Sequence, residues 1–379
     1  MNTMKLCATC LFGLEGLTSS QLKRLGFRDV SAENGRVTFS GDETALAKAL
    51  VNLRFAERVM INIGSFDAVS FTELFDRTYE LPWERFIPVD GAFPVTGSCV
   101  SSVLHSVPDC QKIIKKAAAR RIMEKYRLSW AEEKAELYQI RFTVIRDRVE
   151  LYIDASGQAL HKRGYRAVGT AAPLRETLAA AMADLSGYRG KGVFWDPFCG
   201  SGTIAIEAAL IALNRAPGLN RAFDAMNWRW VNRKIWPQVR QEASAAEFTG
   251  GYEILASDID EGALEIARSN ASKAGVSKLI EFFRADAGEL ELRRGPGRIV
   301  ANPPYGERMM ERREAALLMR RFGKRCSAMD GWSFCVLTAD ADFESSFGSK
   351  ADKKRKLYNG MIKCDLYMYP DKERQWKWK

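Results

Sequence analysis

The segment that decides the fold of this 379-residue chain is DPFCGSGT, residues 196–203. It follows a short apolar run, Val193–Trp195, and it leads into a segment of helical composition, Thr203–Leu213. A strand that ends in a glycine turn and continues as a helix is typical of parallel α/β sheets, where helix N–H groups and strand ends form a ligand crevice. Glycine has no Cβ atom, so the backbone of this turn can approach a ligand closely.

The flanking sequence repeats this alternation of strands and helices. Ile254–Ala256 and Ile299–Ala301 have the composition of buried strands. Leu174–Leu185 has the composition of a helix that Pro173 opens. Near the end, Asn359-Gly360 separates two strand-like runs, which is the signal of a hairpin with a type I′ turn. The sequence therefore predicts an α/β fold, with a Rossmann-like, mostly parallel sheet and an antiparallel C-terminal hairpin.

Three kinds of cofactor bind glycine turns of this type, and two of them do not suit the residues around Gly202. A nucleoside-triphosphate loop needs Lys and then Ser or Thr after its last glycine, whereas Thr203-Ile204 follows Gly202. A dinucleotide site needs a third glycine at position 205, which is Ala, and an acidic residue about 20 residues further on. S-adenosylmethionine remains, because a carboxylate suits its sulfonium and amino groups. The candidate cofactor-binding residues of this turn are Asp196, Phe198, Cys199, Gly200, Gly202 and Thr203.

Two further carboxylates follow other apolar runs. Asp258 ends one run and is the candidate partner of the ribose hydroxyls, with Ile259 beside it against the adenine. Asp286 follows Ile280–Phe283 and can accept the adenine amino hydrogens. Either carboxylate by itself could equally cap a helix or a turn. Three acids near consecutive strand ends beside one glycine turn favour the cofactor role.

A second turn, Asn302-Pro303-Pro304-Tyr305, follows the strand-like run Arg298–Ala301. An exocyclic amino group of a base is a poor nucleophile because its lone pair is delocalised into the ring. The Asn302 side-chain oxygen and the Pro303 carbonyl can accept its two hydrogens. Pro304 stiffens the turn, and Tyr305 can stack on an unstacked base. Asn-Pro-Pro also forms ordinary turns, but its place at a strand end predicts that these four residues are catalytic.

Several motifs together resemble the THUMP-containing class I RNA methyltransferases. They are DPFCGSGT (196–203), SDID (257–260), NPPYGER (302–308), HKRGYR (161–166), APLRETLAA (172–180), APGLNRAF (216–223) and KLYNGMIKC (356–364). The chain is most similar to the guanine-N2 methyltransferase half of the bifunctional 23S ribosomal RNA enzyme. This implies a ferredoxin-like subdomain at 1–60, an overlapping THUMP module at 44–155 and a methyltransferase domain at 165–379. It also implies that the methionine part of the cofactor is bordered by Pro173, Arg175, Glu176 and Thr177.

The resemblance implies methylation of guanine N2 in 23S ribosomal RNA, with S-adenosylmethionine as the methyl donor. Transfer RNA guanine-N2 enzymes share the same layout, so tRNA is an alternative substrate. An adenine-N6 DNA methyltransferase is a further alternative, because Asn-Pro-Pro-Tyr serves either amino group, although the THUMP-like first half argues against DNA. A non-catalytic RNA-binding protein on this scaffold is the last alternative, and the intact motifs argue against it.

Positive charge supports an RNA partner. The formal net charge is +10, and lysine and arginine gain affinity for nucleic acid by neutralising phosphates. Lys112, Lys116 and Arg120 recur at helical spacing and are expected to form one ridge, although such a run can also be a solvated face. The predicted RNA-binding residues are Lys112, Lys115, Lys116, Arg120 and Arg166. Trp228, Trp230 and Trp236 are expected mainly to pack. Lys353–Lys356 is expected just before the hairpin, in contact with either phosphate or solvent.

Other features bear on classes of partner. Cys7 and Cys10 form the only C-x-x-C pair, and the two histidines are distant from it, so no metal site is predicted. The eight scattered cysteines favour a reducing compartment. The sequence contains neither a run of about 18 apolar residues nor a secretory signal, so we expect a cytoplasmic protein without a membrane partner.

Overall fold

The structure is a computed structural model that describes residues 3–129, 132–166, 174–291, 293, 295–304 and 312–371. The chain divides into two compact units, and each is described by itself. The first unit consists of Met1–Cys10, Thr18–Leu160 and Asn220–Gln241. The second unit consists of Leu11–Leu17, His161–Leu219 and Glu242–Lys379.

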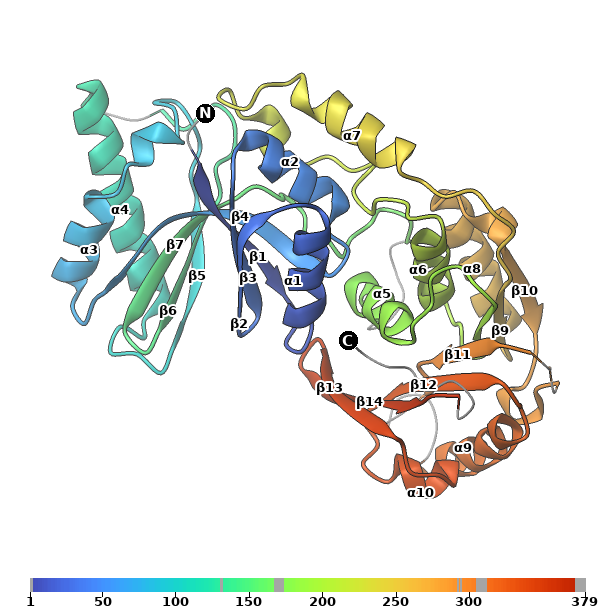
Figure 1. The fold of residues 1–379 in the computed structure, drawn as a ribbon. Coiled ribbons are helices and arrows are strands. Elements are labelled where there is room, and N and C mark those ends of the chain that lie inside the picture. Colours follow the sequence, from blue (N-terminus) through green and yellow to red (C-terminus); the bar gives the residue numbers. More distant parts are fainter. Residues whose placement is uncertain are drawn as a thin grey trace. The chain divides into compact units, whose positions relative to one another are not determined.

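The first unit is built on a seven-stranded sheet in the order β2-β3-β1-β4-β7-β6-β5 (Figure 1). The 12-residue strand β4 is central, because it pairs antiparallel with β1 on one side and with β7 on the other. One long strand therefore joins the strands before it in sequence, β1 to β3, and those after it, β5 to β7, into a single sheet. The strands are β1 (Met4–Cys10), β2 (Arg28–Glu33), β3 (Arg36–Gly41), β4 (Ala56–Asp67), β5 (Val95–Val100), β6 (Ile140–Ile145) and β7 (Arg148–Asp154).

Residues of alternating polarity place one face of this sheet in the core. In β6, Ile140, Phe142 and Val144 are at most 1% exposed, whereas Arg141 and Thr143 between them are half-buried. The helices begin at residues that satisfy their first N–H groups: Ser70 and Glu73 form a capping box at the start of α3. The helices of this part of the chain are α1 (Glu15–Arg24), α2 (Glu43–Asn52), α3 (Phe71–Tyr79) and α4 (Val107–Tyr126).

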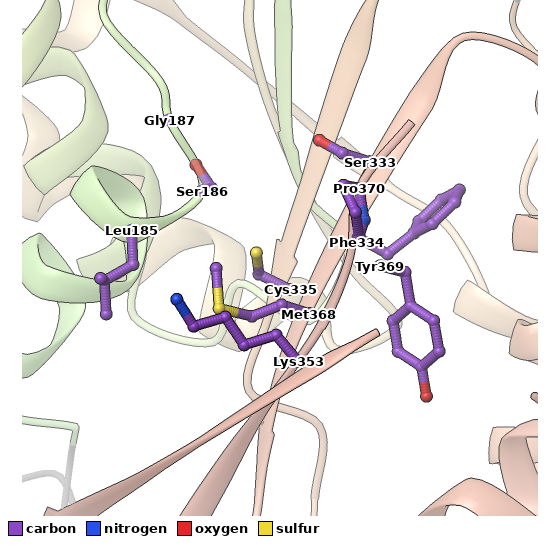
Figure 2. Close-up of a pocket in the computed structure, with 10 residues that line it drawn as sticks. All are labelled: Leu185, Ser186, Gly187, Ser333, Phe334, Cys335, Lys353, Met368, Tyr369 and Pro370. Carbon is purple, nitrogen blue, oxygen red and sulfur yellow. The ribbon is translucent and has the colours of Figure 1, made fainter. Parts of the chain in front are cut away.

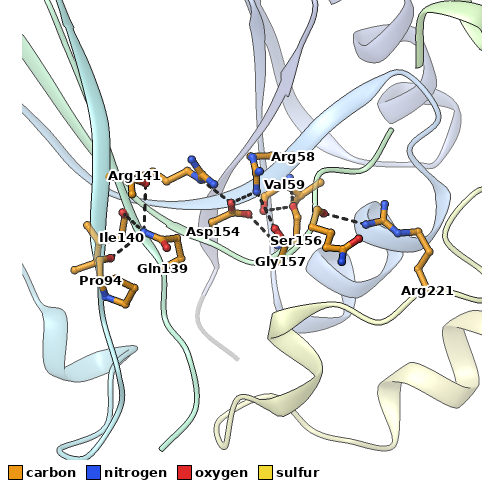
Figure 3. A network of polar contacts seen from close by, with 12 residues as sticks. Arg58, Val59, Pro94, Gln139, Ile140, Arg141, Asp154, Ser156, Gly157 and Arg221 are labelled. Carbon is orange, nitrogen blue, oxygen red and sulfur yellow. Dashed lines mark hydrogen bonds and ion pairs between the residues drawn. The ribbon is translucent and has the colours of Figure 1, made fainter. Parts of the chain in front are cut away.

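A polar network connects β4, β6 and β7 with the residues that follow β7 (Figure 3). The Asp154 side chain is 1% exposed, and its Oδ2 accepts from Arg58 Nη1 at 2.5 Å and from Arg141 Nε at 2.6 Å. Its Oδ1 accepts the backbone N–H of Ser156 at 3.0 Å. Arg58 also donates to the Gly157 carbonyl at 2.9 Å. Two guanidinium groups and one N–H compensate the buried carboxylate, so the network fixes residues 154–157 on the sheet.

The tryptophan-rich segment Asn220–Gln241 belongs to the first unit, although it follows a helix of the second unit in sequence. Trp228 is 1% exposed and stacks on Tyr138, with ring centroids 5.2 Å apart and an interplanar angle of 16°. Its Nε1 donates to the Leu137 carbonyl at 2.9 Å. Trp230 donates to the carbonyl of Phe86 at 3.0 Å. The expectation that these tryptophans mainly pack is confirmed. The helix α7 (Ile235–Ala245) begins in this segment.

The second unit contains a seven-stranded sheet in the order β10-β9-β8-β11-β12-β14-β13 (Figure 1). The five strands from β10 to β12 run parallel, and β14 and β13 form an antiparallel edge. The predicted α/β class, a mostly parallel sheet with a C-terminal hairpin, is confirmed. The strands are β8 (Val193–Asp196), β9 (Ile254–Asp258), β10 (Ile280–Arg284), β11 (Gly297–Ala301), β12 (Trp332–Thr338), β13 (Lys353–Asn359) and β14 (Ile362–Tyr369).

Helices cover this sheet and close an apolar core. Trp195, Phe322 and Trp332 are each at most 3% exposed and belong to one cluster with residues of β11, β12 and β14. Trp195 and Trp332 meet edge to face, with centroids 6.2 Å apart. The helices are α5 (Glu176–Leu185), α6 (Thr203–Ala212), α8 (Glu261–Lys273), α9 (Arg312–Ser327) and α10 (Phe343–Phe347). Within the described residues, we find no helix that is long and apolar enough to cross a membrane.

The C-terminal hairpin differs from the sequence prediction in two respects. Lys353–Lys356 lies inside β13 and not before the hairpin, because Lys353 already pairs with Met368. Asn359 pairs with Ile362, so the turn residues are Gly360 and Met361, and only Gly360 has a positive φ, +64°. This is the pattern of a type II′ turn, so the predicted type I′ turn is wrong. The strand ladder includes Asn359 and thereby shifts the turn by one residue.

The helix expected at Leu174–Leu185 begins two residues later, at Glu176. Arg175 has extended backbone angles, φ −64° and ψ 141°, and its carbonyl accepts the N–H of Ala179 at 2.9 Å. Arg175 is therefore the N-cap residue, and Leu174 precedes the helix. Pro173, which was expected to open the helix, lies outside the described residues.

Candidate active site

The glycine turn and the Asn–Pro corner lie at the same edge of the second unit's sheet. β8 pairs in parallel with β9 on one side and with β11 on the other, so their carboxyl ends share one edge (Figure 1). Trp195 is level with Ile299 in this register. Asp196 is therefore level with Val300, and Asn302 follows two residues further along the neighbouring strand, so both lie at the edge where open α/β sheets bind ligands.

Asp196 is a buried carboxylate with one uncompensated oxygen. Its side chain is 0% exposed, and Oδ1 accepts the Phe198 N–H at 3.2 Å. Oδ2 is buried and has no hydrogen-bond partner among the described residues. Burial raises the pKa of Asp196 well above its ordinary value of 3.8, and the charge of Asp258 raises it further. A buried carboxylate of this kind requires a cation, which the amino group of S-adenosylmethionine can supply.

Three side chains hold the glycine turn and the first residue of α6 in place. Asp258 at the end of β9 accepts the Gly200 N–H on Oδ2 at 2.8 Å. Asn270 of α8, which is fully buried, donates its amide to the Ser201 carbonyl at 3.0 Å. Arg166 donates to the Thr203 hydroxyl at 2.7 Å. Asn270 was not identified in the sequence, because no motif connects a residue in the middle of α8 with this turn.

Two glycines of this turn have conformations that other residues rarely adopt. Gly200 has φ +48°, and a Cβ atom built on it would meet no atom within 4 Å. Gly202 has φ +81°, and a Cβ there would lie 3.0 Å from the Ala267 Cβ. Gly202 therefore allows α6 and α8 to pack closely, whereas Gly200 leaves open space above the turn for a ligand.

The carboxylate of Asp258 accepts hydrogen bonds both from the glycine turn and from Asp260, the N-cap residue of α8. Its Oδ1 accepts the Asp260 N–H at 3.1 Å. Ile259, the predicted adenine contact, is 60% exposed, so its apolar side chain is accessible at this edge. The structure brings Asp258 into contact with the glycine turn. The contacts of Asp258 with the ribose and of Ile259 with adenine stay predictions.

Asp286 caps a short helix and also forms an ion pair. Its Oδ1 accepts the Gly288 N–H at 2.8 Å, and its Oδ2 lies 3.2 Å from Arg321 Nη1 of α9. A Cβ atom on Gly288 would lie 2.9 Å from Cζ of Arg321, so this glycine makes room for the guanidinium. Arg321 was not identified in the sequence. Asp286 follows β10 at the same edge as Asp258, and its contact with adenine stays a prediction.

Residues before and within α5 form a buried charged group. The Glu176 side chain is 4% exposed, and its Oε2 has no hydrogen-bond partner among the described residues. Burial raises the pKa of Glu176, and the Arg166 guanidinium, 3.8 Å away, opposes this rise. Thr177 beside it is fully buried, and Arg175 is partly exposed at the helix cap. The contact of these three residues with the cofactor's methionine part stays a prediction.

The HKRGYR motif packs against the cofactor turn through its arginines and tyrosine. Arg163 and Tyr165 are both directed at the buried Glu207 of α6, at 3.5 Å and 3.1 Å. Arg166 donates to the Leu174 carbonyl at 2.7 Å as well as to Thr203, and its side chain is 15% exposed. Arg166 was predicted to bind RNA. The contacts of its guanidinium instead connect the start of α5 with the start of α6, and its RNA contact stays a prediction.

Asn302 is the described residue that offers an unsatisfied acceptor at the proposed reaction centre. Its Oδ1 is buried and has no hydrogen-bond partner among the described residues. Pro303 is buried and Pro304 is half-buried. Tyr305, the fourth predicted catalytic residue, lies outside the described residues. A buried acceptor without a donor costs about 1–3 kcal/mol, so Asn302 Oδ1 is suited to accept from a ligand, and its catalytic role stays a prediction.

A small cavity in this unit lies at the opposite edge of the sheet (Figure 2). Its volume is about 60 Å³, and its walls include Leu185 of α5, Cys335 of β12 and Met368 of β14. Tyr369, which also lines it, pairs with Phe334 near the start of β12. The start of a parallel strand is remote from the carboxyl-end edge, so this cavity is separate from the cofactor turn.

The predicted RNA-binding residues of the first unit lie on α4. The side chains of Lys112 and Arg120 are 80% and 60% exposed, and Lys116 is also exposed, so the three form the expected ridge. Lys115 lies off this ridge, because its Nζ donates to the Phe93 carbonyl at 3.0 Å and to Glu133 at 2.5 Å. Their contact with RNA stays a prediction.

No cluster of three or more potential metal ligands occurs among the residues that the structure describes. Cys7 and Cys10 are buried free thiols at 0% and 8% exposure. Burial raises the pKa of Cys7 to about 12, which keeps this thiol protonated.

Comparison with known proteins gives matches along the whole chain. Residues 163–368 match the RMKL-like methyltransferase domain. Residues 5–60 match the RlmL ferredoxin-like domain, and residues 68–154 match the THUMP domain.

Two relatives extend these matches. A Bacillus subtilis (strain 168) protein named "Putative RNA methyltransferase YpsC" is 42% identical over 381 residues, which cover 99% of this chain and 98% of the relative. The ribosomal RNA large subunit methyltransferase K/L of Psychromonas ingrahamii is 33% identical over 371 residues, which cover 94% of this chain. The match covers 49% of that relative, so this chain spans about half its length.

Solved structures share the fold over the same length. A Listeria monocytogenes protein described as a "predicted N6-adenine-specific DNA methylase" is 44% identical, with a TM-score of 0.93 over 97% of this chain and 96% of that chain. SMU.472, solved in complex with SAH, is 38% identical, with a TM-score of 0.93 over 99% of this chain and 100% of that chain. The methyltransferase match, together with the residues at the glycine turn, makes S-adenosylmethionine the cofactor of this protein. The chain therefore belongs to the RMKL-like methyltransferase family, with a RlmL ferredoxin-like domain and a THUMP domain before the methyltransferase domain in sequence.

Proposed function

We propose that this protein methylates an exocyclic amino group of a base in RNA, and that the target is guanine N2 of 23S ribosomal RNA. The observation that carries this proposal is the pair of buried, unpartnered oxygens at one sheet edge: Asp196 Oδ2 on the cofactor side and Asn302 Oδ1 on the base side. The first suits a cation and the second suits an amino hydrogen.

In this proposal the residues at the Asn–Pro corner position the target amino group and stabilise the charge that develops on it. Bound S-adenosylmethionine supplies an electrophilic methyl group on sulfonium. Asn302 Oδ1 and the Pro303 carbonyl accept the two amino hydrogens and direct the nitrogen lone pair out of conjugation with the ring. Alignment of the nitrogen with the methyl carbon then accounts for most of the rate enhancement. The base must leave its stack to reach the corner, which single-stranded RNA permits at low cost.

Three observations support RNA as the substrate class. The THUMP match covers residues 68–154, and the ridge of Lys112, Lys116 and Arg120 on α4 falls within it. The relative from Psychromonas ingrahamii is named for the large ribosomal RNA, and YpsC is named for RNA. In this proposal residues 44–155 bind RNA and residues 165–379 transfer the methyl group. Transfer RNA is the alternative substrate within the same chemistry.

The test is methyl transfer from labelled S-adenosylmethionine to total RNA from a strain that lacks the gene. We expect label in the 23S fraction and N2-methylguanosine among the digested nucleosides. Label in tRNA, again recovered as N2-methylguanosine, would change the proposed substrate from 23S ribosomal RNA to tRNA and leave the proposed reaction unchanged. Absence of label in both RNA and DNA, while S-adenosylhomocysteine still binds, would refute the enzyme assignment in favour of a non-catalytic RNA-binding protein.

A second candidate function is adenine-N6 methylation of DNA, and one observation favours it. The Listeria monocytogenes structure with 44% identity is described as an N6-adenine-specific DNA methylase. The same assay with unmethylated genomic DNA separates the two functions. Incorporation into DNA alone, recovered as N6-methyladenine, would establish the second function and exclude the first.

A further inference from the structure

The tip of the C-terminal hairpin has an accessible surface that the reaction centre does not use. Met361 at the turn is 99% exposed, and Ile362 beside it is 50% exposed. Phe12, from the stretch Leu11–Leu17 of the same unit, is 55% exposed. Its ring meets the Tyr358 ring edge to face, with centroids 6.1 Å apart and an interplanar angle of 66°. We call Phe12, Lys356, Tyr358, Met361 and Lys363 the hairpin platform.

The neighbouring stretch is built to hold Phe12 in place. The Gly13 carbonyl accepts from Arg355 Nη2 at 2.8 Å. Gly13 has φ +91°, and a Cβ atom on it would lie 2.7 Å from the Lys356 carbonyl oxygen. Only glycine allows this close approach to β13. The position of Phe12 is therefore fixed by the backbone, although its ring remains half exposed.

The platform carries positive charge beside its aromatic rings. Tyr358 and Lys363 are directly opposite in the strand register, so their side chains lie on the same face. Lys356 and Asp365 form the next pair on that face. Lys356 and Lys363 outnumber the single carboxylate of Asp365 on this face. Lys356 and Lys363 are exposed, and neither has an ion-pair partner among the described residues.

The strand register places the platform at the catalytic edge of the sheet. Ala301, the residue before Asn302, is level with Val336 of β12. Thr338, two residues beyond Val336 in β12, is level with Asp365 of β14. Because β14 runs antiparallel to β12, Lys363 lies two residues further past the carboxyl end of β12. The hairpin therefore extends past the strand ends on the side of Asn302. β14 is two strands away from β11, which corresponds to about 10 Å across the sheet.

We infer that the hairpin platform binds single-stranded RNA next to the target base. Aromatic faces stack on bases of any sequence, and lysines hold the adjoining phosphates. Lys363 also lies three residues beyond the level of Asn302, about 10 Å along the strands, so the two positions are about 14 Å apart. A few nucleotides of single-stranded RNA can span this distance, so the platform would engage a nucleotide near the methylated one while Asn302 holds the target. This inference rests on the proposed function, since it names how the same substrate is gripped.

The test compares three variants with one control. Lys356→Ala/Lys363→Ala removes two exposed charges, Phe12→Leu/Tyr358→Leu removes both rings, and Met361→Ala shortens the tip. The control, Lys273→Ala/Lys278→Ala, removes two exposed lysines on the other side of the sheet, at the end of α8 and just before β10. The probe for binding is a fluorescein-labelled 20-nucleotide RNA of mixed sequence without stable base pairs. Thermal unfolding and S-adenosylhomocysteine affinity show that each variant is folded.

We expect the lysine variant to bind this RNA more weakly and to lower the slope of log Kd against log salt by about 1.4, which corresponds to two phosphate contacts with a single strand. The ring variant should bind about tenfold more weakly with an unchanged salt slope. Met361→Ala should bind a few-fold more weakly. The control should bind as the parent does, and KM for hypomethylated RNA should rise in the platform variants while kcat changes little.

The inference is overturned if folded platform variants bind the RNA with the parent's affinity and salt slope, or if the control loses as much affinity as they do. The first result would leave the apolar tip as a surface for a protein partner. Neither result affects the proposed function, which fails separately if the parent protein transfers no methyl group to RNA.

Discussion

Replacing Asp196 by asparagine should stabilise the cofactor-free protein while weakening cofactor binding. Asp196 is fully buried, and its Oδ2 has no partner among the described residues. Asparagine keeps the shape and the acceptor for the Phe198 N–H but removes the charge. An uncompensated buried polar group costs about 1–3 kcal/mol, and a charged one costs more. Removing at least about 1 kcal/mol of this cost would raise Tm by about 2–4 °C.

The dependence of stability on pH follows from the raised pKa of Asp196. Below pH 3.8, the ordinary pKa, the carboxyl is protonated in both the folded and the unfolded chain. As pH rises above that value, the unfolded chain releases the proton while the folded protein keeps it. The free energy of unfolding therefore decreases with pH until the raised folded pKa is passed. Asp196→Asn removes this dependence, so its stabilising effect should be larger at pH 7 than at pH 4.

The cofactor affinity should change in the opposite direction. Removing one partner of a buried, hydrogen-bonded charge pair costs about 2–5 kcal/mol, which is at least about 30-fold in Kd. Calorimetric titration with S-adenosylhomocysteine measures this loss, and thermal unfolding from pH 4 to 8 measures the stability. The matched control is Asp330→Asn, which changes an exposed carboxylate of the same unit. The reasoning is refuted if Asp196→Asn binds S-adenosylhomocysteine as the parent does, or if the cofactor-free variant is less stable at pH 7.

Three further changes test other parts of the site and the fold. Asn302→Ala should keep S-adenosylhomocysteine affinity and lower kcat by about 10²–10³-fold in the methyl-transfer assay, because it removes an acceptor needed by the amino group; equal rates would exclude the acceptor role. Arg166→Met should weaken S-adenosylhomocysteine binding by about tenfold or more, because the Thr203 and Leu174 contacts are lost. Arg189→Met, at an exposed position after α5, should leave this affinity unchanged. Trp228→Ala should lower the free energy of unfolding of the first unit by about 3–5 kcal/mol in urea, and a loss below about 1 kcal/mol would show that the stacked pair with Tyr138 is not part of its core.

The local elements could largely be predicted from the sequence, since each depends on residues close together in the chain. The C-terminal hairpin is an example, because two strand-like runs flank the short Asn359-Gly360 signal and β13 and β14 pair there. The strand, glycine turn and helix around Gly200 follow the same rule. The turn at Gly360 shows the limit, since strand pairing shifted it by one residue from the predicted position.

Other parts of the site could not be predicted because they depend on which elements become neighbours. Asn270 reaches the Ser201 carbonyl across 69 residues of sequence, and Arg321 reaches Asp286 across 35. Neither residue stands in a recognisable motif, and their roles follow from the packing of α8 and α9. Arg166 has a basic side chain that suits RNA, yet its contacts with Thr203 and Leu174 became visible only in the folded unit.

The sequence by itself determined that the chain carries a glycine turn suited to S-adenosylmethionine and an Asn–Pro corner suited to an amino group, because these depend on the types and spacing of adjacent residues. Only the tertiary structure decided that β8 and β11 are neighbours, so that the two turns share one edge, and that residues 220–241 belong to the first unit. Strand order and long-range packing are set by the free energy of burying the whole core, which no short segment contains.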